Sequence, residues 1–144
     1  MNILKNEKGS ILVEFGFVGP IFIGIIFMML ITGMWIYNAT QTSQAARLAA
    51  HQLAVTGNYS EAYQIAYSHL GKTGIGLSSE EVSVYWSGDM ACAQVITNME
   101  TYMPGLVKLF NPSATNWTGK VTISRGAQTT GEYRLRSGNQ SQFN

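Results

Sequence analysis

The chain has 144 residues and a formal net charge of +1, with 12% charged and 46% hydrophobic residues. Lys and Arg are scattered along it, so there is no basic surface typical of nucleic-acid binding, and no nucleic-acid partner is expected. Its single cysteine, Cys92, excludes an internal disulfide. Cys92 is therefore either a small buried residue or half of an intermolecular bridge.

Residues 10–37 are predicted to form a transmembrane helix. Residues 15–37 contain no Asp, Glu, Lys or Arg, and about 20 apolar helical residues cross a bilayer core. Their apolar side chains point all round the helix rather than along one stripe, and Trp35 and Tyr37 end the run like an interfacial belt. The competing interpretation is a cleaved secretory signal, whose apolar core is shorter, about 7–15 residues.

Glu14 stands at the start of the apolar run, where a carboxylate either has a partner or is solvated at headgroup level. Gly9 lies five positions before it, in the short basic segment 1–9. This order resembles the processing site of type IV pilins and pseudopilins, whose leader is cut after Gly and whose mature chain has Glu at its fifth position. The resemblance implies cleavage after Gly9, which would leave Ser10 as the new N-terminus and make Glu14 the fifth residue of the mature chain, followed by Phe15.

The segment VEFGFVGP, which ends at Pro20, resembles the opening of TadE-like proteins, the minor pseudopilins of tight-adherence pilus systems. The resemblance implies a structural protein in the inner membrane, with a prepilin-type peptidase, other pilins or pseudopilins and the pilus assembly machinery as partners. It implies no cofactor. Pro20 is expected to kink the helix without ending it, because neighbouring helices in a membrane tolerate such breaks.

Charge predicts the orientation of the chain. Lys5 and Lys8 precede the apolar run, whereas the first basic residue after it is Arg47. Positive residues stay on the cytoplasmic side of a membrane segment. We therefore expect a single-pass protein with a cytoplasmic N-terminus and an extracytoplasmic C-terminal domain.

The helix is expected to continue through an Ala-rich stalk, residues 38–56, and to end at the Thr-Gly-Asn sequence that follows. One face of the stalk is predicted to contain Ala45, Leu48, Ala49, Gln52 and Leu53. An extracytoplasmic domain should follow at 57–136, with a disordered tail at 137–144. We expect a fragment from residue 57 onward to fold by itself, unless the stalk is part of its core.

Within that domain, a second helix is predicted over residues 60–70, with Ser60 as its N-cap and Gly71 as its end. Its apolar face should contain Ala62, Ile65, Ala66 and His69 or Leu70. A loop is expected over residues 71–79. This helix and the upper stalk should cover one face of a sheet.

The sequence then alternates with a period of two, which indicates half-buried antiparallel strands. Strands are predicted at 82–87, 93–102 and 120–125, with a weaker one at 132–136 and a turn at Gly88-Asp89. The predicted fold class is α+β: a long N-terminal transmembrane and stalk helix, a short helix, and a small antiparallel sheet.

The sequence contains no motif that predicts catalysis or metal binding, and an enzyme is the least favoured class. His51 and His69 are not paired with Cys in any zinc spacing, and Glu80 and Glu81 are expected to be solvated. Aromatic residues form either an exposed surface or part of the core: Tyr59, Tyr63, Tyr67 and Trp117. Two functions remain: a cleaved pseudopilin that takes part in pilus assembly, or an uncleaved signal-anchored binding module.

Overall fold

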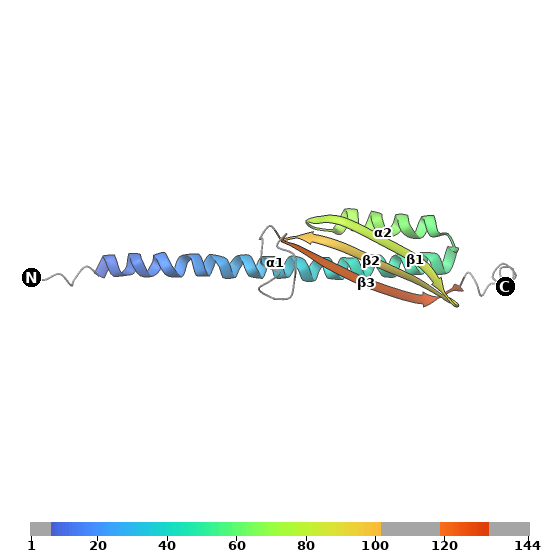
Figure 1. The fold of residues 1–144 in the computed structure, drawn as a ribbon, viewed down its shortest axis with the longest axis horizontal. Helices are drawn as coiled ribbons and strands as arrows, with labels where there is room; N and C mark the ends of the chain where they lie inside the picture. Colours follow the sequence, from blue (N-terminus) through green and yellow to red (C-terminus); the bar gives the residue numbers. More distant parts are fainter. Residues whose placement is uncertain (1–6, 102–118, 133–144) are drawn as a thin grey trace, which may run out of the picture. The chain divides into compact units, whose positions relative to one another are not determined.

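The computed structural model describes residues 7–101 and 119–132. In chain order these form two helices and three strands, α1, α2, β1, β2 and β3, which confirms the predicted α+β class (Figure 1). The contacts divide the chain into two compact units, Met1–Met34 and Trp35–Asn144. Most of the predicted strand at 132–136 and the predicted tail at 137–144 lie outside the described residues.

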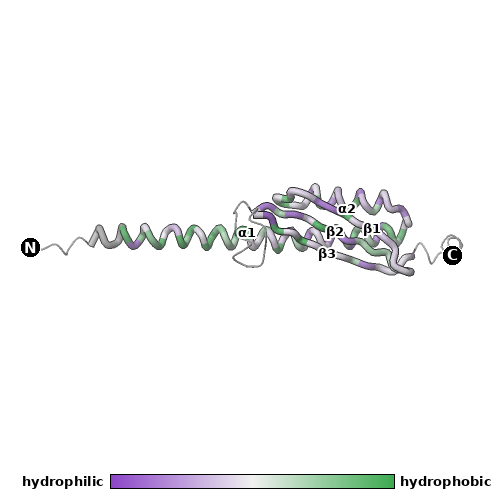
Figure 2. Tube along the Cα trace, in the orientation of Figure 1, coloured by the Kyte–Doolittle hydropathy of each residue, from purple (hydrophilic) through white to green (hydrophobic). Residues whose placement is uncertain are grey.

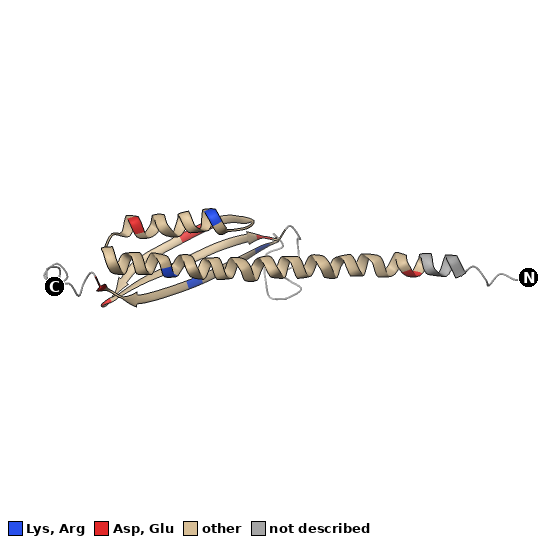
Figure 3. Ribbon diagram, turned by 180° about the vertical axis from the view of Figure 1, so that it is seen from behind, with Lys and Arg blue, Asp and Glu red and all other residues tan. Residues whose placement is uncertain are grey.

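Helix α1 (Glu7–Thr56) continues through Pro20, so the proline does not end the helix, as predicted. It ends at Gly57, whose φ of 68° belongs to the left-handed region and whose N–H donates to the Leu53 carbonyl at 2.9 Å. Figure 2 shows hydrophobic residues along the N-terminal half of α1, and Figure 3 shows how little charge that half carries.

Helix α2 (Tyr59–Thr73) begins earlier and ends later than its sequence signals suggest. The predicted N-cap, Ser60, is wrong: the Asn58 side chain caps the helix by accepting from the Ser60 and Glu61 N–H groups. The predicted end at Gly71 is also wrong, because the helix continues to Thr73. Gly74 then caps it through an N–H bond to the Leu70 carbonyl at 2.7 Å.

The three strands form one antiparallel sheet in the order β1-β2-β3. They are β1 (Leu77–Ser87), β2 (Met90–Glu100) and β3 (Lys120–Thr130). The predicted loop over 71–79 is wrong at both ends, because α2 extends into it and β1 begins inside it. Strand β1 extends because residues from Leu77 onward pair with β2. Gly88, with φ of 58°, makes the predicted turn between Ser87 and Met90.

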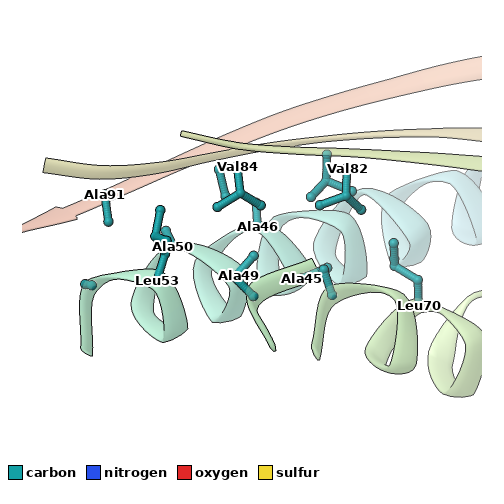
Figure 4. Close-up of a cluster of buried hydrophobic side chains, with 14 residues drawn as sticks. Ala45, Ala46, Ala49, Ala50, Leu53, Leu70, Val82, Val84 and Ala91 are labelled. Carbon is teal, nitrogen blue, oxygen red and sulfur yellow. The ribbon is translucent and has the colours of Figure 1, made fainter. Parts of the chain in front are cut away.

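The core of the second unit lies between the helices and one face of the sheet, as predicted (Figures 1 and 4). The buried residues alternate as expected: Val82 and Val84 on β1, and Val95, Thr97 and Met99 on β2. Most helix side chains of this core are small. The helix residues of the core cluster are Ala45, Ala46, Ala49, Ala50, Leu53, Ala54, Ala62, Ala66 and Leu70.

Two members of the predicted stalk face lie outside this core. Leu48 is 39% exposed and Gln52 is half-buried, while Ala46 and Ala50 take the buried positions. The buried stripe is thus turned slightly around the helix from the predicted one. Alanines occur on several sides of this segment, so their positions alone do not fix which side is buried.

Candidate membrane-anchoring and assembly site

The first unit presents an apolar surface on all sides of α1. Its exposed large hydrophobic residues include Phe15, at 77% exposure, and Ile21, at 64%. Within the part of the chain that the structure describes, α1 alone is long and apolar enough to cross a membrane, with a mean hydropathy of 2.3 in its most apolar window. None of that window is buried in the protein. Such a surface is stable in lipid or against similar helices.

Glu14 is the single charged residue of the segment 13–34. Its side chain is exposed, as is that of the neighbouring Phe15. Burying an ionised carboxylate in hydrocarbon without a partner is costly. The other predicted site residues, Gly9, Ser10 and Pro20, all lie within α1, and Pro20 is exposed.

The remaining polar groups of the apolar segment fit a membrane environment. Thr32 donates its hydroxyl hydrogen to the Met28 carbonyl, one helical turn back, at 2.8 Å, so its polar atom is satisfied inside the helix. Among the residues that the structure describes, no other side chain lies within 4 Å of the place where a Cβ would lie at Gly16, Gly24 or Gly33. There is thus room beside these glycines for a neighbouring helix.

A buried polar cluster begins where the apolar run ends, and the sequence analysis missed it. The Asn38 amide nitrogen donates to the Ile75 carbonyl at 2.7 Å, and its oxygen accepts from the Ile75 N–H at 3.0 Å. One turn later, the Thr42 hydroxyl bonds the Thr97 hydroxyl at 2.9 Å. Asn38, Thr42 and Thr97 are fully buried. These bonds fix α1 to the turn before β1 and to the central strand.

The sequence contains only a weak local indication that Asn38 and Thr42 are buried. Asn38 and Thr42 lie four residues apart and continue the stripe that Ala45, Ala46 and Ala49 occupy further along α1. Their partners are 37 and 55 residues away in the chain, so spacing within the helix does not reveal what they bind.

The histidines and carboxylates of the described residues are dispersed over the structure. Among the described residues, no group of three or more His, Cys, Asp and Glu side chains could hold a metal. His69 Nε2 lies 3.0 Å from Gln41 Oε1, which satisfies that ring nitrogen, and His51 is exposed. Two open grooves, of about 430 and 470 Å³, have no His, Asp or Glu among their described lining residues.

The aromatic residues considered from the sequence do not form one surface. Tyr59 and Tyr67 are 45% and 42% exposed, whereas Tyr63 is partly buried against the core. Trp117 lies outside the described residues. Cys92 is buried, with its sulfur 3.9 Å from the Met90 carbonyl oxygen.

Comparison with known proteins places the similarity in α1. Residues 9–51 match the family model described as TadE-like protein, which confirms over that segment the resemblance drawn from the sequence. The matched residues cover the apolar segment, Glu14, Pro20 and the beginning of the alanine face. Comparisons with curated proteins and with solved structures gave no match.

Proposed function

We propose that this chain is a membrane-anchored minor pseudopilin that takes part in assembly of a tight-adherence or type IV-like pilus. The observation that carries the proposal is the first half of α1, which is exposed, apolar and charged only at Glu14. The match of residues 9–51 to TadE-like proteins supports it. In this role the chain binds other pilins through α1 and performs no catalysis of its own.

The proposed topology follows from charge. Lys5 and Lys8 keep residues 1–9 in the cytoplasm. The helix over 10–37 then spans the inner membrane, and the residues from 38 onward face away from the cytoplasm. A prepilin-type peptidase cuts after Gly9, where the absence of a Cβ lets the backbone enter a narrow site.

Cleavage would give Glu14 a partner. The freed α-amine of Ser10 has an ordinary pKa of about 7.7–8.0 and is charged at neutral pH. Glu14 lies four residues further along the same helix, about 6 Å of rise. The carboxylate and an ammonium, from its own chain or from the next subunit, reduce each other's cost of leaving water. A subunit only partly inserted would bury an unpaired charge, which disfavours incorrect registers.

The processing step is tested by the N-terminal residue of the protein extracted from membranes. We expect Ser10 in the wild type and an intact leader in Gly9→Val, because the valine Cβ blocks the cleavage position. Gly16→Val, a matched glycine substitution outside the leader, should be cut normally. Equal cleavage of Gly9→Val and the wild type would contradict the proposed site. Met1 at the N-terminus of the wild type would favour the uncleaved signal-anchored module instead.

The assembly step is tested through Glu14. The Glu14→Ala variant should insert, fold and be cut, yet should be lost from complexes with partner pilins when these are purified from membranes. Thr32→Ala is the control, because the Thr32 hydroxyl bonds only its own helix among the described residues. Recovery of Glu14→Ala with partner pilins at the wild-type level would show that Glu14 is a solvated headgroup-level acid.

A further inference from the structure

The turn between α2 and β1 carries an exposed apolar side chain at a fixed position. Ile75 is 48% exposed, although its backbone N–H and carbonyl are both bonded to the buried Asn38 side chain. These two bonds hold the turn against α1 at the level of Asn38. The exposure of Ile75 is therefore a property of a rigid turn and not of a loose loop.

The neighbours of this turn on α1 are residues typical of a membrane interface. Trp35, Ile36 and Tyr37, directly before Asn38, are 41%, 56% and 39% exposed. Trp and Tyr concentrate where hydrocarbon gives way to headgroups. Asn38 is three residues beyond Trp35, about 4.5 Å along the helix. The headgroup region on each side of a bilayer is about 5–8 Å deep, so anchoring through α1 would place Ile75 at interfacial depth.

The charges around the turn suit a phosphate-rich surface. Lys72 is exposed in the last turn of α2, three residues before Ile75. The acidic residue Glu100 lies beside the turn, since its N–H donates to the Gly76 carbonyl at 3.0 Å. Its carboxylate forms an ion pair with the Lys120 ammonium at 3.4 Å. Lys72 thus adds positive charge beside the apolar residue.

We infer that Ile75, with Trp35, Ile36 and Tyr37, forms a second membrane contact of the folded unit, in which the turn inserts Ile75 into the interface of the lipid bilayer. The inference uses residues of the second unit alone, and it rests on the proposed anchoring of the chain by α1. Such a contact would limit rotation of the folded unit about its helix before the subunit leaves the membrane.

Depth-dependent quenching of a fluorescent label tests the inference on the full chain. In a Cys92→Ala background, Ile75→Cys, Met90→Cys and Ile26→Cys are each labelled with an environment-sensitive dye. The proteins are reconstituted in phosphatidylcholine and phosphatidylglycerol vesicles that contain lipids with a nitroxide near the headgroup or deep in the acyl chain. Met90 is the matched control, because it is 40% exposed and apolar but lies at the opposite end of the sheet.

We expect headgroup-level nitroxide to quench the label at position 75 several-fold more strongly than the label at position 90, and deep nitroxide to quench position 26. Equally weak quenching at 75 and 90, with position 26 quenched, would overturn the second contact while leaving the anchoring intact. Absence of quenching at position 26 would overturn the anchoring and, with it, this inference. If the fluorescence of the label at position 75 changes with the protein-to-lipid ratio and not with the nitroxide, a second copy of the chain covers Ile75. That result would also overturn the inferred membrane contact.

Discussion

At the scale of single residues, Asn38 joins parts of the chain that are far apart in sequence. Its side chain uses both a donor and an acceptor on Ile75, and it is fully buried. In Asn38→Ala, the Ile75 N–H and carbonyl both lose their partner. A buried polar group without a partner costs about 1–3 kcal/mol. Both bonds are only part-buried, so we expect the variant to lose about 1–3 kcal/mol of unfolding free energy, measured by denaturation of the full chain in detergent.

The control for this substitution lies two residues further along the same helix. Thr40→Ala removes an exposed hydroxyl that bonds the Ile36 carbonyl of its own helix at 3.0 Å. Exposed substitutions usually change stability by less than about 0.5 kcal/mol. Comparable losses in Asn38→Ala and Thr40→Ala would show that the bonds to Ile75 are not what stabilises the turn.

Glu80 differs from the solvated acid expected from the sequence. It pairs with buried Thr97 in the sheet register and is itself partly buried, and this burial raises the pKa of its carboxyl above the ordinary value of 4.5. The folded chain therefore binds the proton more tightly than the unfolded chain. The contribution of the Glu80 carboxyl to the free energy of unfolding is complete below pH 4.5, and it is lost as pH rises through the raised pKa.

Glu80→Gln should remove this pH dependence, because the amide is never ionised. We expect the variant to melt at a higher temperature than the wild type at neutral pH, and the difference to vanish below pH 4.5. The matched control is Glu81→Gln, whose side chain is exposed one position along the strand. A pH-independent difference between Glu80→Gln and the wild type would count against desolvation as the cause.

At the scale of elements, the alanine face of α1 forms part of the core of the second unit. Ala46 is fully buried and lies near Val84 in the core (Figure 4). Adding methylene groups to a packed core costs about 1–3 kcal/mol through strain. Ala46→Leu should lower the unfolding free energy by that amount in chemical denaturation. Gln44→Leu places the same side chain on an exposed position of the helix and should leave stability nearly unchanged.

The elements also show which features the sequence could predict. The strand alternation was right because side chains on a strand point to opposite faces in turn, which depends on no other part of the chain. The start of β1, predicted at residue 82, and the end of β3, predicted at residue 125, were misplaced. Pairing with β2 continues beyond both positions, and local sequence does not show where pairing begins or ends. The α2 cap was misplaced because Asn58 and Ser60 are both good cap residues, and local sequence does not choose between them.

The candidate site also combines features that the sequence predicts with features that it does not. The apolar segment of α1 is evident from composition, since every residue of 15–37 is uncharged. The bonds of Asn38 and Thr42 are not evident, because their partners, Ile75 and Thr97, are brought near only by the tertiary fold. The apolar segment can thus be recognised from local sequence, whereas the bonds that attach the sheet and its preceding turn to α1 cannot.

At the scale of the whole molecule, the upper part of α1 belongs to the core of the second unit. Six of the 14 residues in the core cluster come from α1. Without them, four larger core side chains lose one side of their packing: Leu70, Val82, Val84 and Val95. Full burial of such a side chain stabilises a protein by about 1.5–3 kcal/mol. The loss is thus up to about 6–12 kcal/mol, comparable with the total stability of a small domain.

We therefore expect fragments 35–144 and 57–144 to behave differently. Fragment 35–144 should show mixed helix and strand by circular dichroism and should melt cooperatively. Fragment 57–144 should not melt cooperatively, because the sheet face that α1 covers is left in water. Adding a synthetic peptide of residues 35–56 should restore the transition, since it supplies Asn38, Thr42 and the alanine face. A cooperative melt of fragment 57–144 alone, at the same temperature as the longer fragment, would show that this domain folds without α1.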